Sequence, residues 1–257
     1  MNEDIRFQPK ELEWTPEKIA RFWDYEGQNL AKVGEYFTKQ VGDALIDLAR
    51  SYGALAEPVL DYGAGPGHLT EKLVLQGLVC DACDFSPVSL DARKKRLASH
   101  ASFRDGVCLS GLPSALPAEG YGTVFLAETM EHLLPGWREK TLQEIYRVLR
   151  WGGFVVVTVP HAENLQAAQV MCPECGAIFH RVQHVAAFDC RTLENAMVEQ
   201  GFKKVACHPI DLVRISNEMQ APWRRFQRLF REALGRVRVL SPRPSITPNL
   251  VYVGRKA

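Results

Sequence analysis

Two cysteines and two histidines at short spacing form the segment of the chain best suited to binding a metal. Cys172 and Cys175 form a Cys-x-x-Cys turn followed by glycine, and His180 and His184 come shortly after it. A structural zinc ion takes four nitrogen or sulfur ligands in a tetrahedron. The spacing therefore predicts a structural zinc site with these four residues as ligands. A redox pair and a pair of reduced core cysteines remain as alternatives.

A second group of residues could move a proton. Glu131 and His132 follow an expected strand at 123–127, and His161 follows another at 154–159. Ligands of parallel sheets lie at the carboxyl ends of the strands, so these side chains should face a bound substrate. A general base must lie within hydrogen-bonding distance of the proton that it removes. His132 is the first candidate for this role and His161 the second.

A glycine-rich turn could hold a nucleoside. Asp61 ends a short apolar segment and is followed by Gly63, Gly65 and Gly67 at alternate positions. Glycines allow the backbone to approach a ligand more closely than a Cβ atom would permit. Asp84 ends the next apolar segment, where a carboxylate can bind ribose hydroxyls.

The register of these glycines indicates which nucleoside is bound. A dinucleotide-binding fingerprint has its third glycine where this chain has His68, so the pattern argues against a nicotinamide cofactor. The helix expected from His68 onward would present its N-terminal amides to the ligand. A turn that serves only to pack strand against helix is the alternative.

Apolar strands and helices must alternate to position these residues. Strands are expected at 58–62, 78–84, 102–104, 123–127, 154–159 and 202–207, and helices at 15–51, 68–76, 140–149 and 192–200. Continuous apolar strands that alternate with helices predict an α/β fold in which helices cover both faces of a parallel sheet.

Several of these segments resemble the class I S-adenosylmethionine-dependent methyltransferases. The stretch 61–67 matches their D-x-G-x-G-x-G pattern, 128–132 resembles the E-x-x-E-H segment of many O-methyltransferases, and Trp151-Gly152-Gly153 matches the turn before their fifth strand. The stretch 248–253 resembles their seventh strand. The resemblance implies a Rossmann-like, doubly wound, mostly parallel seven-stranded sheet with an antiparallel last strand.

The resemblance also implies a cofactor, S-adenosyl-L-methionine, and a reaction. We expect O-methylation of a small metabolite or of a sugar or glycan hydroxyl. Asp84 would bind the ribose, Phe85 would lie on the adenine and Asp105 would meet the adenine amino group. The expected cofactor-binding residues are Asp61, Gly63, Ala64, Gly65, Gly67, Asp84, Phe85, Asp105 and Glu128.

Two further resemblances bear on metals. Small-RNA 2′-O-methyltransferases hold a divalent ion with a Glu-x-x-Glu-His segment and a distant histidine, which Glu128, Glu131, His132 and His184 could match. Metal-assisted methylation of RNA ribose is therefore an alternative function. The cysteine turn resembles a zinc knuckle whose last cysteine is replaced by histidine. A catalytically silent module that only binds the cofactor is a third possibility.

The chain reads as a helical N-terminal cap over 1–56 and a methyltransferase domain over 57–257. The domain carries a zinc-binding insertion at 165–190 and a basic helical insertion at 209–247. Between Arg214 and Arg243 there are eight arginines and two glutamates. A surface helix on the body, a membrane-surface contact, and binding of a phosphorylated, glycan or nucleic-acid acceptor remain open for this basic segment.

Composition narrows the class of protein. Hydrophobic residues make up 46% and charged residues 24% of the chain, which is ordinary for a globular protein. No apolar run reaches the roughly 20 residues that span a bilayer, and the first residues lack the apolar core of a signal peptide. Seven cysteines, an odd number, favour a reducing cytoplasm. A net charge of +1 gives no general attraction to nucleic acid. The oligomeric state stays open.

Overall fold

The computed structural model describes residues 8–28, 36–220 and 248–257. Its α-helices are α1 (Pro16–Gln28), α2 (Phe37–Ser51), α3 (His68–Leu75), α4 (Pro87–Leu97), α5 (Pro135–Val148), α6 (Cys190–Glu199) and α7 (Leu212–Gln220). Its strands are β1 (Lys10–Glu11), β2 (Val59–Tyr62), β3 (Cys80–Asp84), β4 (Phe103–Cys108), β5 (Tyr121–Ala127), β6 (Leu149–Pro160), β7 (Gln169–Met171), β8 (Ala177–His180), β9 (Phe202–Ile210) and β10 (Asn249–Lys256). Two short 3-10 helices lie at Met130–His132 and Leu165–Ala168.

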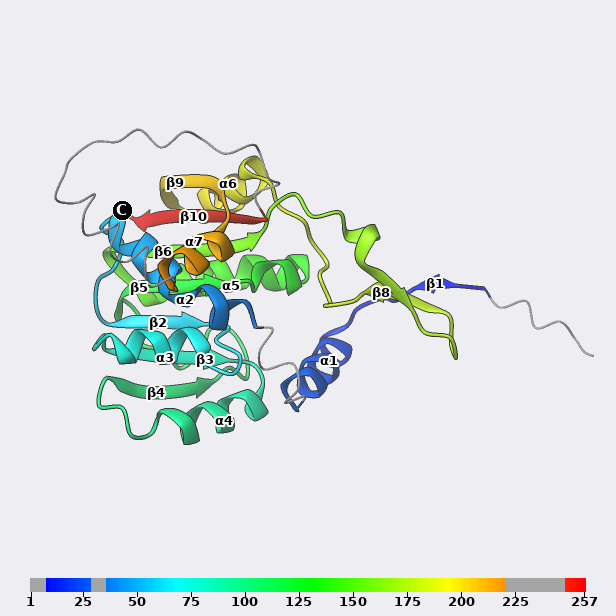
Figure 1. Ribbon diagram of the computed structural model, residues 1–257, viewed down its shortest axis with the longest axis horizontal. Coiled ribbons are helices and arrows are strands. Elements are labelled where there is room, and N and C mark those ends of the chain that lie inside the picture. Colours follow the sequence, from blue (N-terminus) through cyan, green and yellow to red (C-terminus); the bar gives the residue numbers. More distant parts are fainter. Residues whose placement is uncertain (1–7, 29–35, 221–247) are drawn as a thin grey trace, which may run out of the picture.

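A seven-stranded sheet forms the centre of the molecule (Figure 1). Its strand order is β4-β3-β2-β5-β6-β10-β9. The pairs from β4 to β6 are parallel, whereas β10 runs antiparallel to both β6 and β9. The predicted Rossmann-like sheet with an antiparallel last strand is confirmed.

Helices cover both faces of this sheet, and each face has its own apolar core. Leu142 of α5 and Leu193 of α6 belong to one buried cluster with strand residues such as Leu126. Leu45 of α2 and Leu69 of α3 belong to the other cluster. The two layers hold the strands rigidly, so the loops at their carboxyl ends have fixed positions.

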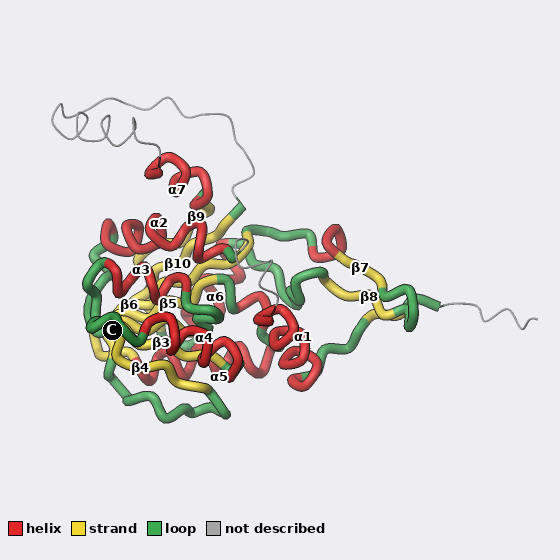
Figure 2. The backbone as a smooth tube through the Cα atoms, turned by 60° about the horizontal axis from the view of Figure 1, so that its bottom comes forward, coloured by secondary structure: helices red, strands yellow, loops and turns green. Residues whose placement is uncertain are grey.

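A second, smaller sheet projects from this body as an arm, which lies at the right of Figure 1. It consists of β1, β8 and β7, with β1 parallel and β7 antiparallel to β8. Figure 2 shows the same projection from another direction. The arm contains the cysteine turn, and β1 brings a strand from the N-terminal residues to the predicted insertion.

Some elements differ from those expected. The helical region predicted for 15–51 contains two helices, α1 and α2, and only α2 enters the core. The weak third strand expected at 102–104 is the longer β4, and α4 and the arm sheet were not predicted, whereas α7 lies within the expected helical insertion at 209–247. The basic helix expected near 222–234 lies outside the described residues.

Two of the seven cysteines lie in the core of the central sheet. Cys80 and Cys83 of β3 are buried and belong to different apolar clusters, because their side chains point to opposite faces of the sheet. All seven cysteines are free thiols. Among the described residues, no helix has the length and apolar character required to cross a bilayer.

Candidate functional site at the carboxyl edge of the sheet

The glycine turn between β2 and α3 has the backbone conformation that only glycine adopts readily. Gly63, Gly65 and Gly67 have φ angles of +71°, +49° and +79°. A Cβ atom on Gly63 would lie 2.7 Å from the Thr129 side chain, so this turn touches the loop after β5. A Cβ atom on Gly65 would meet nothing within 4 Å, which leaves open space above the turn.

Two carboxylates fix the turn from different sides. Asp84, at the end of β3, accepts hydrogen bonds from the backbone amides of Gly65 (2.7 Å) and Ser86 (2.8 Å). Asp61 accepts from the amide (3.0 Å) and the hydroxyl (2.6 Å) of Thr70 in α3. Burial raises the pKa of Asp61 to about 6, against the effect of these hydrogen bonds. Asp84 thus lies at the turn as predicted, while Asp61 supports it from inside.

Two residues were expected to contact the adenine, Phe85 and Asp105, and they lie at different distances from the end of a strand. Phe85 follows Asp84, is 39% exposed and contacts the ring of Trp137 edge to face at 5.7 Å. Asp105 lies in the middle of β4, where its exposed carboxylate faces Lys94 at 3.6 Å. The carboxyl end of β4 is Cys108, which pairs with Asp84. Asp105 therefore lies three residues before the carboxyl end of the strand, and its contact with the adenine stays a prediction.

Two glutamates lie after β5 without the partners that buried charges need. Glu128 has a φ of +46°, an uncommon value outside glycine, and its Oε1 has no hydrogen-bond partner among the described residues. Glu131 is fully buried, and both of its carboxylate oxygens lack such a partner. Burial raises the pKa of Glu128 to about 8 and that of Glu131 well above its usual range. Buried charges of this kind normally pair with a cation or coordinate a metal.

His132 is neutral and has one ring nitrogen free. Its Nδ1 donates to the Gln183 carbonyl oxygen at 3.4 Å, which leaves a lone pair on Nε2, 3.8 Å from Glu131 Oε1. Burial lowers the pKa of His132 to about 3. Trp23 of α1 contacts the His132 ring edge to face at 4.7 Å and donates from its indole nitrogen to Gln183 Oε1. The helix α1 thus covers this histidine.

His184 is oriented by a carboxylate. Its Nδ1 lies 2.5 Å from Glu163 Oε2, so this nitrogen donates and Nε2 carries the free lone pair. His180 stacks on His184 at 4.5 Å, and its Nδ1 accepts from the His184 amide at 3.1 Å. The remaining nitrogen of His180 lies 3.4 Å from Glu163 Oε1. Burial acts to raise the pKa of Glu163, but hydrogen bonds and charges from both histidines hold it below its usual range.

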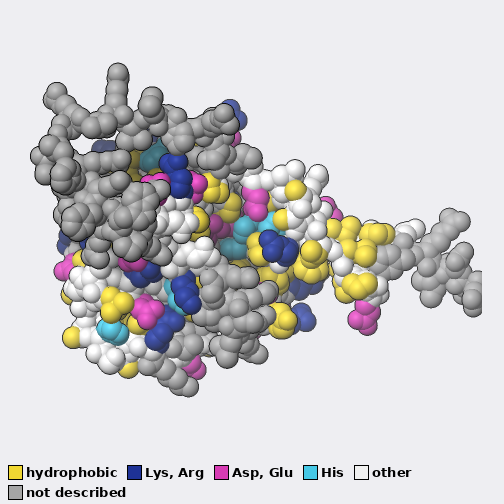
Figure 3. Space-filling view, in the orientation of Figure 1, with side chains coloured by type: hydrophobic (Ala, Val, Ile, Leu, Met, Phe, Trp, Pro, Cys, Tyr) yellow, Lys and Arg dark blue, Asp and Glu magenta, His cyan; other side chains and the backbone are white. Residues whose placement is uncertain are grey.

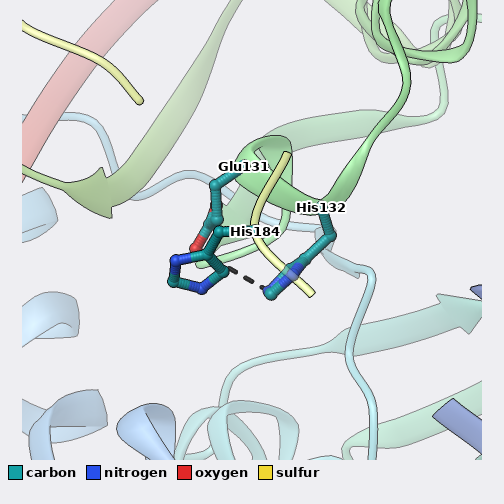
Figure 4. A group of neighbouring side chains, drawn as sticks. All are labelled: Glu131, His132 and His184. Atoms are coloured by element: carbon teal, nitrogen blue, oxygen red, sulfur yellow. Dashed lines mark ion pairs between the residues drawn. The ribbon is translucent and has the colours of Figure 1, made fainter. Parts of the chain in front are cut away.

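Three of these side chains lie close together, as Figure 4 shows for Glu131, His132 and His184. Glu131, His132 and His184 each offer a ligand atom, and these atoms lie within 4.8 Å of one another. Glu163, His180 and His184 form a second such group that shares His184. In Figure 3, histidine side chains gather on the surface where the arm meets the body. The arrangement has the composition of a metal site supported by a second layer of hydrogen bonds.

The cysteine turn lies apart from these histidines. In the hairpin of β7 and β8, Cys172 hydrogen-bonds with Ala177 at one end of β8, whereas His180 pairs with Gln169 at the other. Three residues of strand span about 10 Å. The four predicted zinc ligands thus do not form one group in the described residues, since the histidines lie with Glu163. Hydrogen bonds from the backbone amides of residues 175 and 174 lower the pKa of the Cys172 thiol.

His161 lies directly after β6, at the edge of the sheet where it was expected. Its backbone amide donates to the Pro248 carbonyl at 3.0 Å, and the residue forms a bridge with Phe188. It is half-buried. Its role as a general base stays a prediction.

Comparison with known proteins agrees with this arrangement. A family described as "Methyltransferase domain" matches residues 16–207, three quarters of the chain. The chain belongs to this family. A malonyl-[acyl-carrier protein] O-methyltransferase of Serratia marcescens is 28% identical over 153 residues, which cover 58% of this chain and 54% of that protein. An uncharacterised methyltransferase of Anoxybacillus flavithermus is 28% identical over 116 residues, 45% of this chain and 53% of that protein.

The methyltransferase therefore spans about half the length of these curated relatives. Among solved structures, it resembles the 1,6-didemethyltoxoflavin-N1-methyltransferase of Burkholderia thailandensis, with a TM-score of 0.62 and 17% identity. That match covers 96% of this chain and 93% of the other. At this level of identity the likeness shows the fold.

Sequence reasoning missed several residues of the site. Glu163, Gln183 and Trp23 contact the histidines, and Trp137 contacts Phe85. They come from four different parts of the chain, so no local spacing connects them. A weak signal existed for Glu163, an acid two residues after His161 in the loop that follows β6.

Proposed function

We propose that this methyltransferase transfers a methyl group from S-adenosyl-L-methionine to a hydroxyl, assisted by a divalent metal ion held by Glu131, His132 and His184. The acceptor is a sugar, glycan or small metabolite that carries a second oxygen next to the reacting hydroxyl. The observation that carries the proposal is the convergence of these three ligand atoms beside the glycine turn.

The glycine turn fits the proposed cofactor. Gly65 faces open space, and Asp84 presents a carboxylate beside it, as ribose hydroxyls require. Phe85 and Trp137 supply an apolar wall next to that acid. The fold neighbour from Burkholderia thailandensis binds S-adenosylhomocysteine, the product form of this cofactor. When bound, the cofactor supplies an electrophilic methyl group.

The donor set fits a divalent ion such as Mn²⁺. Two imidazoles and a carboxylate suit first-row metals, and oxygen ligands favour the harder ones. Glu131 has no other partner among the described residues to balance its buried charge. Glu128 lies close enough for its charge to raise the pKa of Glu131, so it is a fourth candidate ligand. When bound, the ion makes a coordinated hydroxyl more acidic.

The remaining side chains of the site orient these ligands and exclude water. Gln183 holds the His132 ring through Nδ1, and Glu163 holds the His184 ring in the same way. Trp23 shields His132 from solvent, so α1 acts as a partial lid. Under this proposal His132 is a ligand instead of the first candidate base, and His161 accepts the hydroxyl proton.

The 2′-hydroxyl of a terminal RNA ribose is a second candidate acceptor. The specific observation in its favour is that Glu131, His132 and the distant His184, singled out by the resemblance to small-RNA methyltransferases, converge. A terminal ribose also offers two adjacent hydroxyls. The basic segment that could bind the phosphates lies largely outside the described residues.

Methyl transfer to defined probes tests the proposal. Purified protein is incubated with methyl-labelled cofactor, Mn²⁺ and either methyl β-ribofuranoside or a hexose glycoside. A short oligoribonucleotide with a free terminal diol tests the second candidate. The matched deoxy compound of each probe lacks one of the two hydroxyls. We expect transfer to a diol probe, at least tenfold less to its deoxy counterpart, and loss of transfer with a chelator.

Three results would count against the proposal. Transfer that persists undiminished with the chelator would exclude the metal. Equal transfer to diol and deoxy probes would exclude recognition of two oxygens. Binding of S-adenosylhomocysteine without turnover on any probe would favour the silent cofactor-binding module. The cytoplasmic location stays a prediction.

A further inference from the structure

The cysteine turn is a rigid structure at the end of the arm. The Cys172 amide donates to the Ala177 carbonyl at 2.9 Å, and the Gly176 amide donates to the Cys172 carbonyl at 2.9 Å. Gly176 has a φ of +72°, which closes the turn. The Lys10 amide of β1 donates to the Gly176 carbonyl at 3.0 Å, so a third strand clamps it.

The two thiols of this turn are arranged as a pair of metal ligands. The backbone amides of Glu174 and Cys175 donate to the Cys172 sulfur, and the Cys175 side chain also hydrogen-bonds with it. The tight turn keeps the two cysteines three positions apart on one bend, and the amide donors stabilise negative charge on the Cys172 sulfur. Neither cysteine is buried, so both are accessible at the surface of the arm.

This pair is only half of a zinc site. A structural zinc ion needs four ligands, which are mostly cysteine and histidine. All seven cysteines and all seven histidines of the chain lie within residues 8–28, 36–220 and 248–257. Within those ranges, no group of three potential ligands includes Cys172 or Cys175. The same chain thus supplies no third cysteine or histidine to this turn.

A second copy of the chain supplies the missing ligands. We propose that two copies bind one zinc ion between their arms, each contributing Cys172 and Cys175. A twofold axis through the ion makes the contact self-complementary, as in most homodimers. Binding replaces four S–H bonds by four Zn–S bonds and releases four protons. The ion with four thiolates carries a net charge of −2.

The arm suits such a contact. It projects away from the body, so two tips can meet without a clash between the two sheets (Figures 1 and 2). Val170 and Met171 of β7 are 39% and 44% exposed next to the turn and would be covered in the dimer. Lys10 pairs with Ala177 beside the turn, so β1 adds a basic residue to the part of the arm that would carry the thiolates.

Zinc content and mass in solution test this inference together. The native protein is purified under reducing conditions, and zinc is measured beside the molar mass from light scattering. We expect one zinc per two chains and the mass of a dimer. Cys172→Ser should give a monomer without zinc at this site, with unchanged affinity for S-adenosylhomocysteine. Cys207→Ser, which removes a half-buried cysteine of β9, is the matched control and should remain a zinc-bound dimer.

The spectrum of a substituted metal identifies the ligands. Co²⁺ bound by four thiolates gives intense absorption in the visible and near-ultraviolet that a site of nitrogen and oxygen ligands does not. We expect this spectrum in the wild type and in Glu131→Gln, and its loss in Cys172→Ser. A zinc-bound monomer, a zinc-free protein, or a dimer that survives denaturation only without reductant would overturn the inference. Because Glu131→Gln disables only the proposed catalytic metal, failure of one metal site is distinguishable from failure of the other.

Discussion

Two turns that depend on glycine, the one from Gly63 to Gly67 and the one from Cys172 to Gly176, differ in how much of a site the single chain completes. The first is connected to β3, to α3 and to the loop after β5 by hydrogen bonds and close contacts. The backbone hydrogen bonds of the second turn, within the described part of the chain, go to the strands of its own arm. A turn enclosed by the body finds its partners in the same chain, whereas a turn on a projecting arm presents unused ligands to another molecule.

The largest effect should come from filling the open space above the first turn. Gly65→Val keeps a Cβ free of protein contacts but places a side chain where the cofactor lies. We expect the affinity for S-adenosylhomocysteine to fall at least 100-fold, about 2.7 kcal/mol, in a calorimetric titration.

Gly77→Val is the matched control for this change. Gly77 also has a positive φ, +79°, and open space at its Cβ, but it lies at the far end of α3. Both variants should lose about 1–2 kcal/mol of unfolding free energy, because a side chain strains the backbone at a positive φ. If both lost the cofactor equally, the loss would reflect strain alone.

The next effect concerns the metal ligands. Glu131→Gln replaces a buried carboxyl group that faces His132 with a neutral amide that cannot become a charged ligand. Because a Lewis-acid metal contributes several kcal/mol, methyl transfer to the best diol probe with Mn²⁺ should fall on the order of 100-fold or more. Affinity for S-adenosylhomocysteine should not change. The exposed Glu139→Gln serves as the control. Equal activity of the two variants would remove Glu131 from the site.

A smaller effect is expected in the layer behind the ligands. Glu163→Gln weakens the acceptor that orients His184 and leaves the ligand itself in place. Changes of this kind typically cost about 10–100-fold in metal affinity. Titration with Mn²⁺ should show such a loss, whereas Cys172→Ser should not change the Mn²⁺ affinity. An equal loss in both variants would mean that the two metal sites are coupled.

The smallest effect is on stability as a function of pH. Glu128 has a folded-state pKa of about 8, above its unfolded value, so it binds more protons in the folded state. Its contribution to stability is present at low pH and is lost as the pH rises from about 4.5 to 8. His132, with a folded-state pKa of about 3, has the opposite effect: its contribution to stability increases as the pH rises from 3 to 6.5.

In the metal-free protein the melting temperature should therefore fall between pH 6.5 and 8. In this range Glu128 still makes stability decrease with pH, and His132 no longer makes it increase. Glu128→Gln should flatten this fall, and saturating Mn²⁺ should also flatten it, because the ion favours charged carboxylates. A melting temperature that rises over this range in the metal-free protein would contradict the burial of these acids.

The sheet and the cofactor turn could be predicted because their signals are local. Asp61, three glycines and Asp84 lie on two consecutive strand ends, and parallel pairing brings such ends together. The end of β4 was harder to predict, because the strand was expected at 102–104 and extends to Cys108, which leaves Asp105 within the strand.

The metal ligands were harder to predict because spacing alone does not give the path of the chain. The segment from Cys172 to His184 has the spacing of one zinc site, but the β7–β8 hairpin directs its cysteines and histidines to opposite ends. Glu163 pairs with both His180 and His184, and it lies in a loop that no sequence motif indicates. Which side chains meet at the metal site therefore depends on burial and on contacts between distant parts of the chain.

Titration with Mn²⁺, followed by electron paramagnetic resonance of the free ion, tests the proposed metal-assisted methyltransferase most directly. The wild type and Cys172→Ser should each bind one Mn²⁺ per chain with the same affinity, and Glu131→Gln and His184→Ala should lose this binding while they retain S-adenosylhomocysteine. Mn²⁺ binding that is unchanged in Glu131→Gln and His184→Ala would contradict a catalytic metal at the carboxyl edge of the sheet.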